Sequence, residues 1–283
     1  MNRQKSFEKE KGILYLIPSP IGNMQDISLR AIDTIKVVDF LFCEDTRVTN
    51  KLLMKLNIEK NLGSFHEFNK DIQKEKIINL LKQGYNVGLI SDAGMPLVSD
   101  PGYEAVTLAI ENDIPVVAIP GASALLTGLI TSGIKPYPFI FYGFLSHKES
   151  ERKKELQKLM SKEETLIFYE APHRIKETLK NMYEIFGDRH FAIARELTKI
   201  HEEIIRGTLK ESLELTDLIG EMVIIVEGQK EETPKIDLSI KDHINLYLQN
   251  GFELKEAMKK VAKDLNTSKS EVYDRYLKEV KES

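Results

Sequence analysis

The sequence predicts an α/β protein built from two sheet domains and a small helical tail. Short, continuously apolar runs such as residues 13–17 alternate with segments whose apolar residues recur at helical spacing, such as residues 28–38. Continuously apolar strands are typical of a sheet that is covered on both faces. The pattern changes at the Gly- and Pro-containing stretch 131–138 and again at the polar stretch 229–234. These two changes divide the chain into three parts.

The composition is that of a globular protein with room for two cores. At 283 residues, with 42% hydrophobic and 30% charged residues, the chain is long enough for two domains. No stretch approaches the roughly 20 apolar residues of a membrane helix. The polar opening MNRQKSFEKEKG lacks the apolar centre of a signal peptide. We therefore expect a cytoplasmic protein that does not associate with a membrane.

Charge and cysteine content narrow the classes of function. The net charge of -4 argues against a broadly basic protein that coats nucleic acid, although it leaves room for a local basic face. The mildly basic segment 148–162 fits either a solvated helix with ion pairs between successive turns or an RNA-binding patch. Cys43 is the only cysteine, which excludes an intramolecular disulfide and a cysteine-based zinc cluster. We expect Cys43 to be a small buried apolar group.

We place the first domain at residues 12–133. A strand followed by a helix and another strand forms a right-handed parallel crossover. The expected elements are strand 13–17, helix 28–38, strand 40–43, a helix around 71–83, strand 87–90, helix 103–111 and strand 116–119. The first domain is therefore expected to be an open parallel sheet.

We place the second domain at residues 134–230. Its apolar runs and helical patterns predict a second sheet that is covered by helices. The expected elements are strand 139–144, the charged helix 148–160, strand 165–169, a helix from residue 175, strand 191–195 and strand 222–226. The polar stretch 229–234 is predicted to be a linker between the second domain and the helical tail.

The last part, residues 235–283, is predicted to be a helical tail. Residues 254–262 are amphipathic, residues 265–268 supply a turn and an N-cap, and residues 270–277 start another helix. Helix, short turn and helix is the helix-turn-helix pattern. The tail is nearly neutral, with ten basic and nine acidic residues. Its sequence is therefore compatible with a generic helical hairpin and with a nucleic-acid-binding unit.

Three unusual loops follow expected strands of the first domain, at residues 18–23, 91–102 and 120–124. In an open α/β sheet, ligands bind at the carboxyl ends of the strands. Glycine lets a backbone approach a ligand closely, proline stiffens a loop, and aspartate accepts hydrogen bonds. The loops therefore predict a ligand site at this edge of the sheet.

Several common enzyme classes lack their motif in this sequence. Gly22 is the only glycine in the first loop, so the G-x-G-x-x-G cradle of a dinucleotide site is missing, although Glu44 and Asp45 follow the second strand where a ribose-binding acid would stand. No phosphate-binding P-loop, H-E-x-x-H or G-x-S-x-G motif occurs. The residues also predict no metal site. A dehydrogenase is therefore the weakest of the enzyme hypotheses.

One series of motifs runs in order from Gly12 to Gly228: IPSPIGN, CEDTR, FHEFN, SDAGMPLVSDPGY, PGASA, FYGFL, FYEAPHR, RELTKIHEE, and RG followed by GEMVIIVEG. This series resembles the ribosomal RNA small subunit methyltransferase I family, which belongs to the tetrapyrrole-methylase-like, or class III, methyltransferases. The resemblance implies two α/β domains of the tetrapyrrole methylase type, with a cofactor cleft between them. The long segments SDAGMPLVSDPG and YEAPHR carry most of its specificity.

The resemblance also implies an activity. Members of the family are usually homodimers that bind S-adenosylmethionine in the cleft. They transfer its methyl group to the ribose 2'-oxygen of a decoding-centre cytidine in the 16S rRNA of the small ribosomal subunit. This chain departs from the family pattern where Met95 replaces the usual threonine and where PGASA replaces PGPSA. The first departure puts any role of the threonine hydroxyl in doubt.

By resemblance, the cofactor site draws on loops of both domains. Its expected residues are Pro18, Asp92, Ala93, Gly94, Met95, Pro96, Ser123, Ala124, Tyr169, Glu170 and Leu197. For Asp92, a helix cap or an Asx turn is the alternative role. We expect residues 99–102 to cap the following helix, with Pro101 in its first turn.

Methyl transfer to a hydroxyl is an in-line displacement, so alignment and exclusion of water are the main tasks of the enzyme. The hydroxyl must also lose its proton, so a general base is expected nearby. The candidate bases are Glu44, Asp45, Glu170, His173 and Glu196. We choose Glu170 and Glu196 as catalytic hypotheses. Each candidate acid has an alternative role as the structural partner of an arginine.

Contacts to RNA phosphates need cationic side chains, and arginine offers a fork of donors that matches phosphate oxygens. The expected RNA-binding residues are Arg47, His173, Arg174, Arg195 and Lys199. Tyr142, Phe144 and Phe65 are candidates for stacking on splayed bases, with burial in a core as the alternative.

Three other functions compete with RNA methylation. A small-molecule tetrapyrrole methylase is the nearest, and the YEAPHR and RELTKIHEE segments disfavour it. A helix-turn-helix binding protein would depend on the tail alone and would leave the three loops unexplained. A dehydrogenase comes last.

Overall fold

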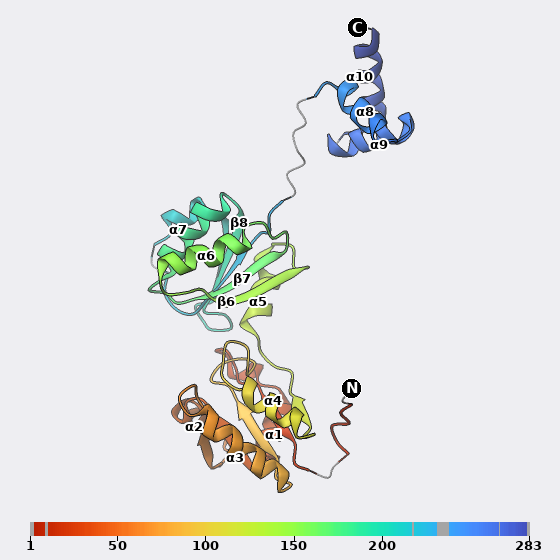
Figure 1. Cartoon of the computed structure of the whole chain (residues 1–283). Helices are drawn as coiled ribbons and strands as arrows, with labels where there is room; N and C mark the ends of the chain where they lie inside the picture. Colours follow the sequence, from red (N-terminus) through yellow and green to blue (C-terminus); the bar gives the residue numbers. More distant parts are fainter. Residues whose placement is uncertain (1–2, 9–10, 217, 231–237, 266, 282–283) are drawn as a thin grey trace. The chain divides into compact units, whose positions relative to one another are not determined.

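The computed structural model describes residues 3–8, 11–216, 218–230, 238–265 and 267–281 (Figure 1). It divides into two compact units. We call Met1–Gln229 the α/β unit and Lys230–Ser283 the tail unit, and each is described by itself. Most of the expected linker at 229–234 lies outside the described residues.

The first sheet is parallel, as the sequence predicted. Its order is β3-β2-β4-β1-β5. The strands are β1 (Leu14–Ile17), β2 (Phe40–Cys43), β3 (Leu62–Ser64), β4 (Val87–Ile90) and β5 (Val116–Ala118). β3 was not predicted, because its three residues, Leu-Gly-Ser, contain no apolar run.

Helices cover both faces of the first sheet. α1 (Leu29–Val37) and α2 (Thr46–Leu56) pack in one apolar cluster, and α3 (Lys70–Lys82) and α4 (Tyr103–Glu111) pack in the other (Figure 1). A single 3-10 turn, η1 (Met24–Asp26), follows β1. The sequence analysis did not predict α2, which buries only Thr49, Leu52 and Leu53 and leaves apolar residues such as Met54 exposed. The Asp45 side chain starts α2 by accepting a hydrogen bond from the Arg47 N–H.

The second sheet is mixed. Its order is β6-β7-β10-β8-β9, in which β6 and β7 are parallel and the other neighbours are antiparallel. The strands are β6 (Phe139–Phe144), β7 (Thr165–Glu170), β8 (His190–Arg195), β9 (Glu203–Thr208) and β10 (Met222–Val226). β9 was not predicted, because it is a half-exposed edge strand with charged residues at Glu203 and Arg206. A 3-10 turn, η2 (Glu211–Glu214), lies between β9 and β10.

The two faces of the second sheet are covered by different parts of the chain. α6 (Glu149–Leu159) and α7 (Ile175–Phe186) pack on one face through Leu156, Leu179 and Met182. α5 (Ala124–Ser132) packs on the other face, against Ala194 and Val223. The expected domain boundary lies after residue 133, so α5 belongs to the first domain in sequence but packs on the second sheet. α5 therefore ties the last loop of the first sheet to the second sheet.

The tail unit contains three helices in its described residues. They are α8 (Ile240–Gln249), α9 (Leu254–Asp264) and α10 (Lys269–Lys281). The sequence predicted the last two but not α8. Ile244, Val261 and Val272 are fully buried, one from each helix, so the tail has a small core of its own. Asn266 in the expected turn lies outside the described residues.

Among the described residues, no helix combines the length and the apolar character that a membrane span requires.

The packing of α5 predicts how much truncation of a buried side chain lowers the free energy of unfolding. Leu129 is 2% exposed, so Leu129→Ala should lower the free energy of unfolding by about 2–5 kcal/mol. Ile130, the next residue of the same helix, is 73% exposed, so Ile130→Ala should change it by less than about 0.5 kcal/mol. Urea unfolding of both variants measures the difference. Equal effects would contradict the packing of α5 on the second sheet.

Candidate active site

The loops at the carboxyl ends of β1, β4 and β5 meet the ends of β7, β8 and β10 around one cavity of about 280 Å³. Its wall from the first sheet includes Ile21, Gly94 and Met95. Its wall from the second sheet includes Leu197 and Val223. Because β10 runs antiparallel to β7 and β8, the start of β10 lies beside their ends. Both sheets therefore contribute to one site.

A backbone bridge fixes the first two loops. The Ser19 N–H donates to the Gly94 carbonyl at 3.0 Å, and the Gly94 N–H donates to the Ser19 carbonyl at 3.1 Å. Gly94 has φ +76°, and a Cβ atom there would stand 3.2 Å from Ile21 Cγ2. Glycine is the residue that adopts this conformation without strain. The bridge places Ile21 and Gly94 together in the cavity wall.

Tyr169 connects the third loop to the second sheet. The Leu125 N–H, in the first turn of α5, donates to the Tyr169 hydroxyl at 3.2 Å. The Tyr169 ring packs edge-on against Phe141 and Phe144, with centroids 4.9 and 5.6 Å apart. Burial raises the pKa of the Tyr169 hydroxyl, so it is neutral over the physiological range. Tyr169 thus orients the start of α5, where Ser123 caps the helix.

The cavity brings together most of the cofactor residues that the resemblance implied. Ala93, Gly94, Met95, Ser123, Ala124, Tyr169, Glu170 and Leu197 line it. Pro18, Asp92 and Pro96 do not. Pro18 packs against Gly121 so closely that a Cβ atom at position 121 would stand 2.3 Å from Pro18 Cγ. The Asp92 carboxylate accepts a hydrogen bond from the Asp45 N–H at 3.2 Å and lines a different cavity.

The second half of the SDAGMPLVSDPG segment was expected to cap a helix, and this expectation is right for Gly102 but wrong for Ser99, Asp100 and Pro101. The N-cap of α4 is Gly102, which has no side-chain cap, and Pro101 lies before it rather than in the first turn. Ser99 and Asp100 instead line the cavity. Leu97 and Ser99 adopt positive φ angles of 69° and 70°, which L residues rarely do. These two turns direct the segment toward the site before the helix begins.

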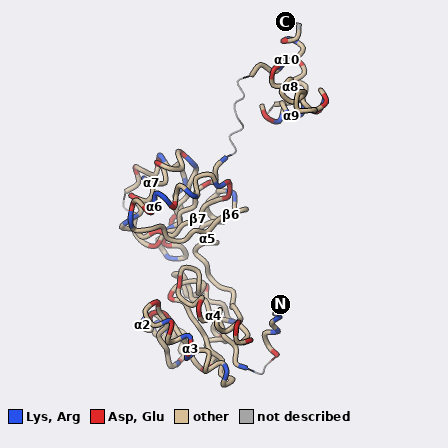
Figure 2. Tube along the Cα trace, viewed as in Figure 1, with Lys and Arg blue, Asp and Glu red and all other residues tan. Residues whose placement is uncertain are grey.

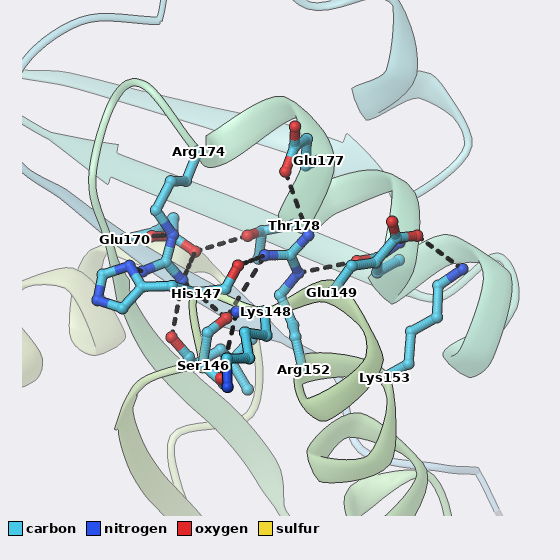
Figure 3. Close-up of polar contacts among 12 residues, drawn as sticks. Ser146, His147, Lys148, Glu149, Arg152, Lys153, Glu170, Arg174, Glu177 and Thr178 are labelled. Carbon is cyan, nitrogen blue, oxygen red and sulfur yellow. Dashed lines mark hydrogen bonds and ion pairs between the residues drawn. The ribbon is translucent and has the colours of Figure 1, made fainter.

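Glu170 is the centre of a buried ion-pair network (Figure 3). Its side chain is fully buried, and its carboxylate accepts hydrogen bonds from Thr178 Oγ1 at 2.6 Å and the Ala171 N–H at 2.8 Å. Arg174 Nε lies 3.3 Å from Glu170 Oε1. The structure therefore gives Glu170 the alternative role, that of an arginine's partner.

Arg174 was expected to contact RNA, but its position contradicts this. The residue is 8% exposed. Its guanidinium donates to the Leu145 carbonyl at 2.7 Å, and its Nη1 lies 2.7 Å from His147 Nδ1 (Figure 3). A guanidinium whose donors are used inside the protein has no fork left for a phosphate. The sequence alone could not show this, because the pattern around an arginine does not tell whether its side chain is buried or exposed.

A second buried arginine, Arg152, holds the same loop from α6. Arg152 is 1% exposed and donates from Nε to Asn181 Oδ1 at 2.8 Å. Its Nη1 donates to the carbonyls of Ser146 and His147, both at 3.4 Å. α6 carries both basic and acidic residues (Figure 2), as expected for a solvated helix, but Arg152 is buried. Together, Arg152 and Arg174 fix the loop after β6, next to the cavity residue Phe144.

Glu196 lies beside the cavity but is engaged with other groups. Its Oε1 accepts from Lys199 Nζ at 3.0 Å and from the Glu221 N–H at 3.1 Å. Lys199 lowers the pKa of the Glu196 carboxyl. Arg195, the adjacent arginine, pairs with Glu203 instead. Lys199 also pairs with Glu221 at 3.0 Å.

The remaining residues that were expected to contact RNA differ in their exposure. The Arg47 side chain is 86% exposed and pairs with Asp45, whose pKa it lowers to about 2. His173 is exposed. Phe65 is fully buried, so it belongs to the core rather than to a stacking surface. Tyr142 and Phe144 are 38% and 54% exposed.

Comparison with known proteins identifies the family of this chain. Residues 13–212 match the model of the Tetrapyrrole (Corrin/Porphyrin) Methylases. The chain is 50% identical to the ribosomal RNA small subunit methyltransferase I of Bacillus subtilis, over 98% of each chain. It is 44% identical to the protein of that name from Halalkalibacterium halodurans, over 99% of this chain and all of the relative.

The chain belongs to the ribosomal RNA small subunit methyltransferase I family of tetrapyrrole methylases.

A solved structure supports the fold of this methyltransferase. The uroporphyrin-III-C-methyltransferase of Thermus thermophilus superposes with a TM-score of 0.53 at 17% identity, over 76% of this chain and 94% of that chain. S-adenosylmethionine is the methyl donor of tetrapyrrole methylases and of this chain. Within the described residues, no group of three or more His, Cys, Asp and Glu side chains is placed to hold a metal ion.

The cavity is also lined by residues that the sequence analysis did not assign to the cofactor site. They are Ile21, Val98, Ser99, Asp100, Phe144, Ala194, Glu221, Met222 and Val223, of which Phe144 was expected to stack on RNA bases. The sequence could have indicated Asp100, because it belongs to the same motif as the expected cofactor contacts. It could not have indicated Met222 and Val223, because only the antiparallel pairing of β10 brings them to this edge of the sheet.

The buried network predicts a stability effect. Glu170→Gln should lower the free energy of unfolding by about 3–5 kcal/mol, because it leaves the Arg174 charge buried without its counter-charge. Glu203→Gln, at the half-exposed partner of Arg195, should cost less than about 1 kcal/mol. Urea unfolding at neutral pH compares them. If Glu170→Gln were as mild as Glu203→Gln, the buried pair would not have the role described here.

The cavity predicts an effect on donor binding. Ala93 lines the cavity and is itself exposed, so Ala93→Leu adds volume to the cavity without overpacking the core. We expect the Kd for S-adenosylmethionine to rise about tenfold or more, since the added atoms compete with the donor for space. Titration calorimetry measures this. Ala118→Leu, at an exposed position of β5 away from the cavity, is the matched control, and equal Kd values for the two variants would contradict the location of the site.

Proposed function

We propose that this chain transfers a methyl group from S-adenosylmethionine to the ribose 2'-oxygen of a decoding-centre cytidine in 16S rRNA. The names of relatives at 43–50% identity, which cover almost the whole chain, support a substrate in small-subunit ribosomal RNA. The single structural observation that carries the proposal is the cavity shared by the loops of both sheets. The choice of ribose oxygen and cytidine follows from the resemblance of the motifs.

The residues around the cavity suit this donor. Ile21, Leu197 and Val223 provide apolar walls for the nucleoside. The carboxyl group of Glu221 stands at the same cavity and complements the positive charge of the donor. Gly94 lets the backbone of its loop approach a ligand closely. The donor supplies an activated methyl group, which a sulfonium releases readily.

The task of the protein is to hold the acceptor oxygen in line with the methyl group and to exclude water. Two buried arginines hold the loop after β6, and α5 holds the loop after β5, so both walls of the cavity are supported from behind. Positive φ angles occur in the loops of both sheets, at Ser99 and at Thr198. Such conformations persist only where the surrounding structure enforces them. Both loops are thus preorganised.

Glu170 and Glu196 stay hypotheses for the base. The contacts of each favour a structural role, because Glu170 is sealed by Thr178 and Arg174, and Glu196 is held by Lys199. A base needs a free oxygen within hydrogen-bond reach of the hydroxyl.

For the RNA, we propose contacts from the exposed residues of the expected set. Arg47 and His173 are exposed, and the aromatic rings of Tyr142 and Phe144 are accessible for stacking. Arg195 and Lys199 are each paired with a carboxylate and would have to exchange partners to bind a phosphate. We also infer a homodimer that acts on ribosomes in the cytoplasm, and light scattering of the purified chain measures the mass that tests the dimer.

A labelling experiment tests the proposal. Wild-type protein is incubated with methyl-labelled S-adenosylmethionine and small ribosomal subunits that lack the modification. We expect label in one cytidine, and we expect alkali to leave the bond after it intact, since a 2'-O-methyl group removes the nucleophile for cleavage. Small subunits that already carry the modification are the control. Label on a base, or transfer to a porphyrinoid but not to RNA, would contradict the proposed function.

A further inference from the structure

The cavity wall contains three carboxylates, namely Asp100, Glu170 and Glu221. Glu170 is fully buried and already accepts hydrogen bonds from Thr178 and Ala171. Glu221 is 75% exposed and forms an ion pair with Lys199. Asp100 makes no hydrogen bond or ion pair with any described residue, although it is only partly exposed. Among the three, Asp100 alone has no hydrogen-bond or ion-pair partner among the described residues.

Asp100 also stands where two cavities meet. Besides the cavity for the donor, Ser99 and Asp100 line a neighbouring, more open cavity of about 390 Å³. The other walls of this second cavity come from the end of β2 and the start of α4, at Glu44 and Tyr103. A nucleotide that enters through the open cavity therefore meets the Asp100 carboxylate at the boundary with the donor cavity.

We propose that Asp100 is the general base that accepts the proton of the ribose hydroxyl. This inference depends on the proposed function. In the step, the ribose oxygen forms a bond to the methyl carbon as the carbon–sulfur bond breaks. The electron pair of that bond stays on sulfur, which becomes a neutral thioether, and the hydroxyl proton passes to the Asp100 carboxylate. Charge and atoms balance without any further reactant.

The surroundings of Asp100 suit this role. Burial, followed by the neighbouring charges of Glu44 and Asp92, raises the pKa of Asp100 to about 6. The other titratable groups that line the two cavities are Glu67, Tyr103 and Glu104 on one side and Tyr169, Glu170 and Glu221 on the other. None of these is a cation, and Lys70, the cation beside the second cavity, is paired with Glu67 and Glu104. A base with a pKa just below neutral is ionised at pH 7 and still accepts a proton effectively.

The test compares Asp100→Asn with Asp33→Asn, at an exposed position of α1. We expect Asp100→Asn to lower kcat by about 100-fold or more, with the Kd for S-adenosylmethionine changed less than about threefold. The kcat of the wild type should rise with pH, with its midpoint near pH 6, whereas the residual rate of Asp100→Asn should lack this dependence. Asp33→Asn should match the wild type in all three measurements.

A second readout needs no activity. Because the folded pKa lies above the unfolded value of 3.8, the contribution of Asp100 to stability is fully present below about pH 4 and is lost as Asp100 ionises between about pH 4 and 6. Asparagine does not ionise, so Asp100→Asn should have the higher Tm at pH 7.5 and no advantage at pH 4. Thermal unfolding of the free protein across this range measures the difference.

The outcomes separate the two proposals. Unchanged kcat in Asp100→Asn, with an active wild type, would overturn the role of Asp100 alone. A large rise in Kd with kcat retained would also overturn it, because Asp100 would then be a counter-charge for the donor. A wild type that forms no 2'-O-methyl ribose would overturn the proposed function and this inference with it. Equal Tm values for wild type and Asp100→Asn at pH 7.5 would contradict the electrostatic argument.

Discussion

The site depends on the burial of one apolar cluster between the loops of the first sheet and the face of the second. Ile21, from the loop after β1, and Leu129, from α5, pack with Ala194, Leu197 and Val223. Burying such side chains is the main favourable contribution to folding, and a close-packed cluster transmits little movement. Because the same residues Ile21, Leu197 and Val223 line the donor cavity, the packing that joins the two sheets also shapes the site.

Charges in the second sheet add a further constraint. Arg152 and Arg174 are both buried, and both donate to backbone carbonyls between Leu145 and His147. Burying two guanidinium groups is costly, and the cost is offset only because nearly every donor has a partner. The hydrogen bonds and the ion pair of Glu170 occupy its carboxylate. The proposed general base is therefore Asp100, which lies outside this network.

Much of the fold could be predicted from the sequence, because hydrophobic periodicity reports directly on strands and helices. The strands with apolar runs, from β1 to β10, and the charged helix α6 followed from that pattern. β3, α2, β9 and α8 did not, since each has few buried residues or a polar edge, and tertiary contacts decide their structure. α5 was not predicted either. The motif loops located the site, but not the roles within it. Whether Arg174 or Asp100 is paired depends on contacts between residues far apart in the chain, which a single sequence does not contain.

The central claim is that loops of both sheets form one donor site, and a crystal structure of the full chain with S-adenosylhomocysteine tests it most directly. This account predicts that the ligand lies between Gly94 and Ile21 on one side and Leu197 and Val223 on the other, with its sulfur facing Asp100. Ligand density at another place on the α/β unit, such as the cavity lined by Thr49 and Asp92, would contradict it.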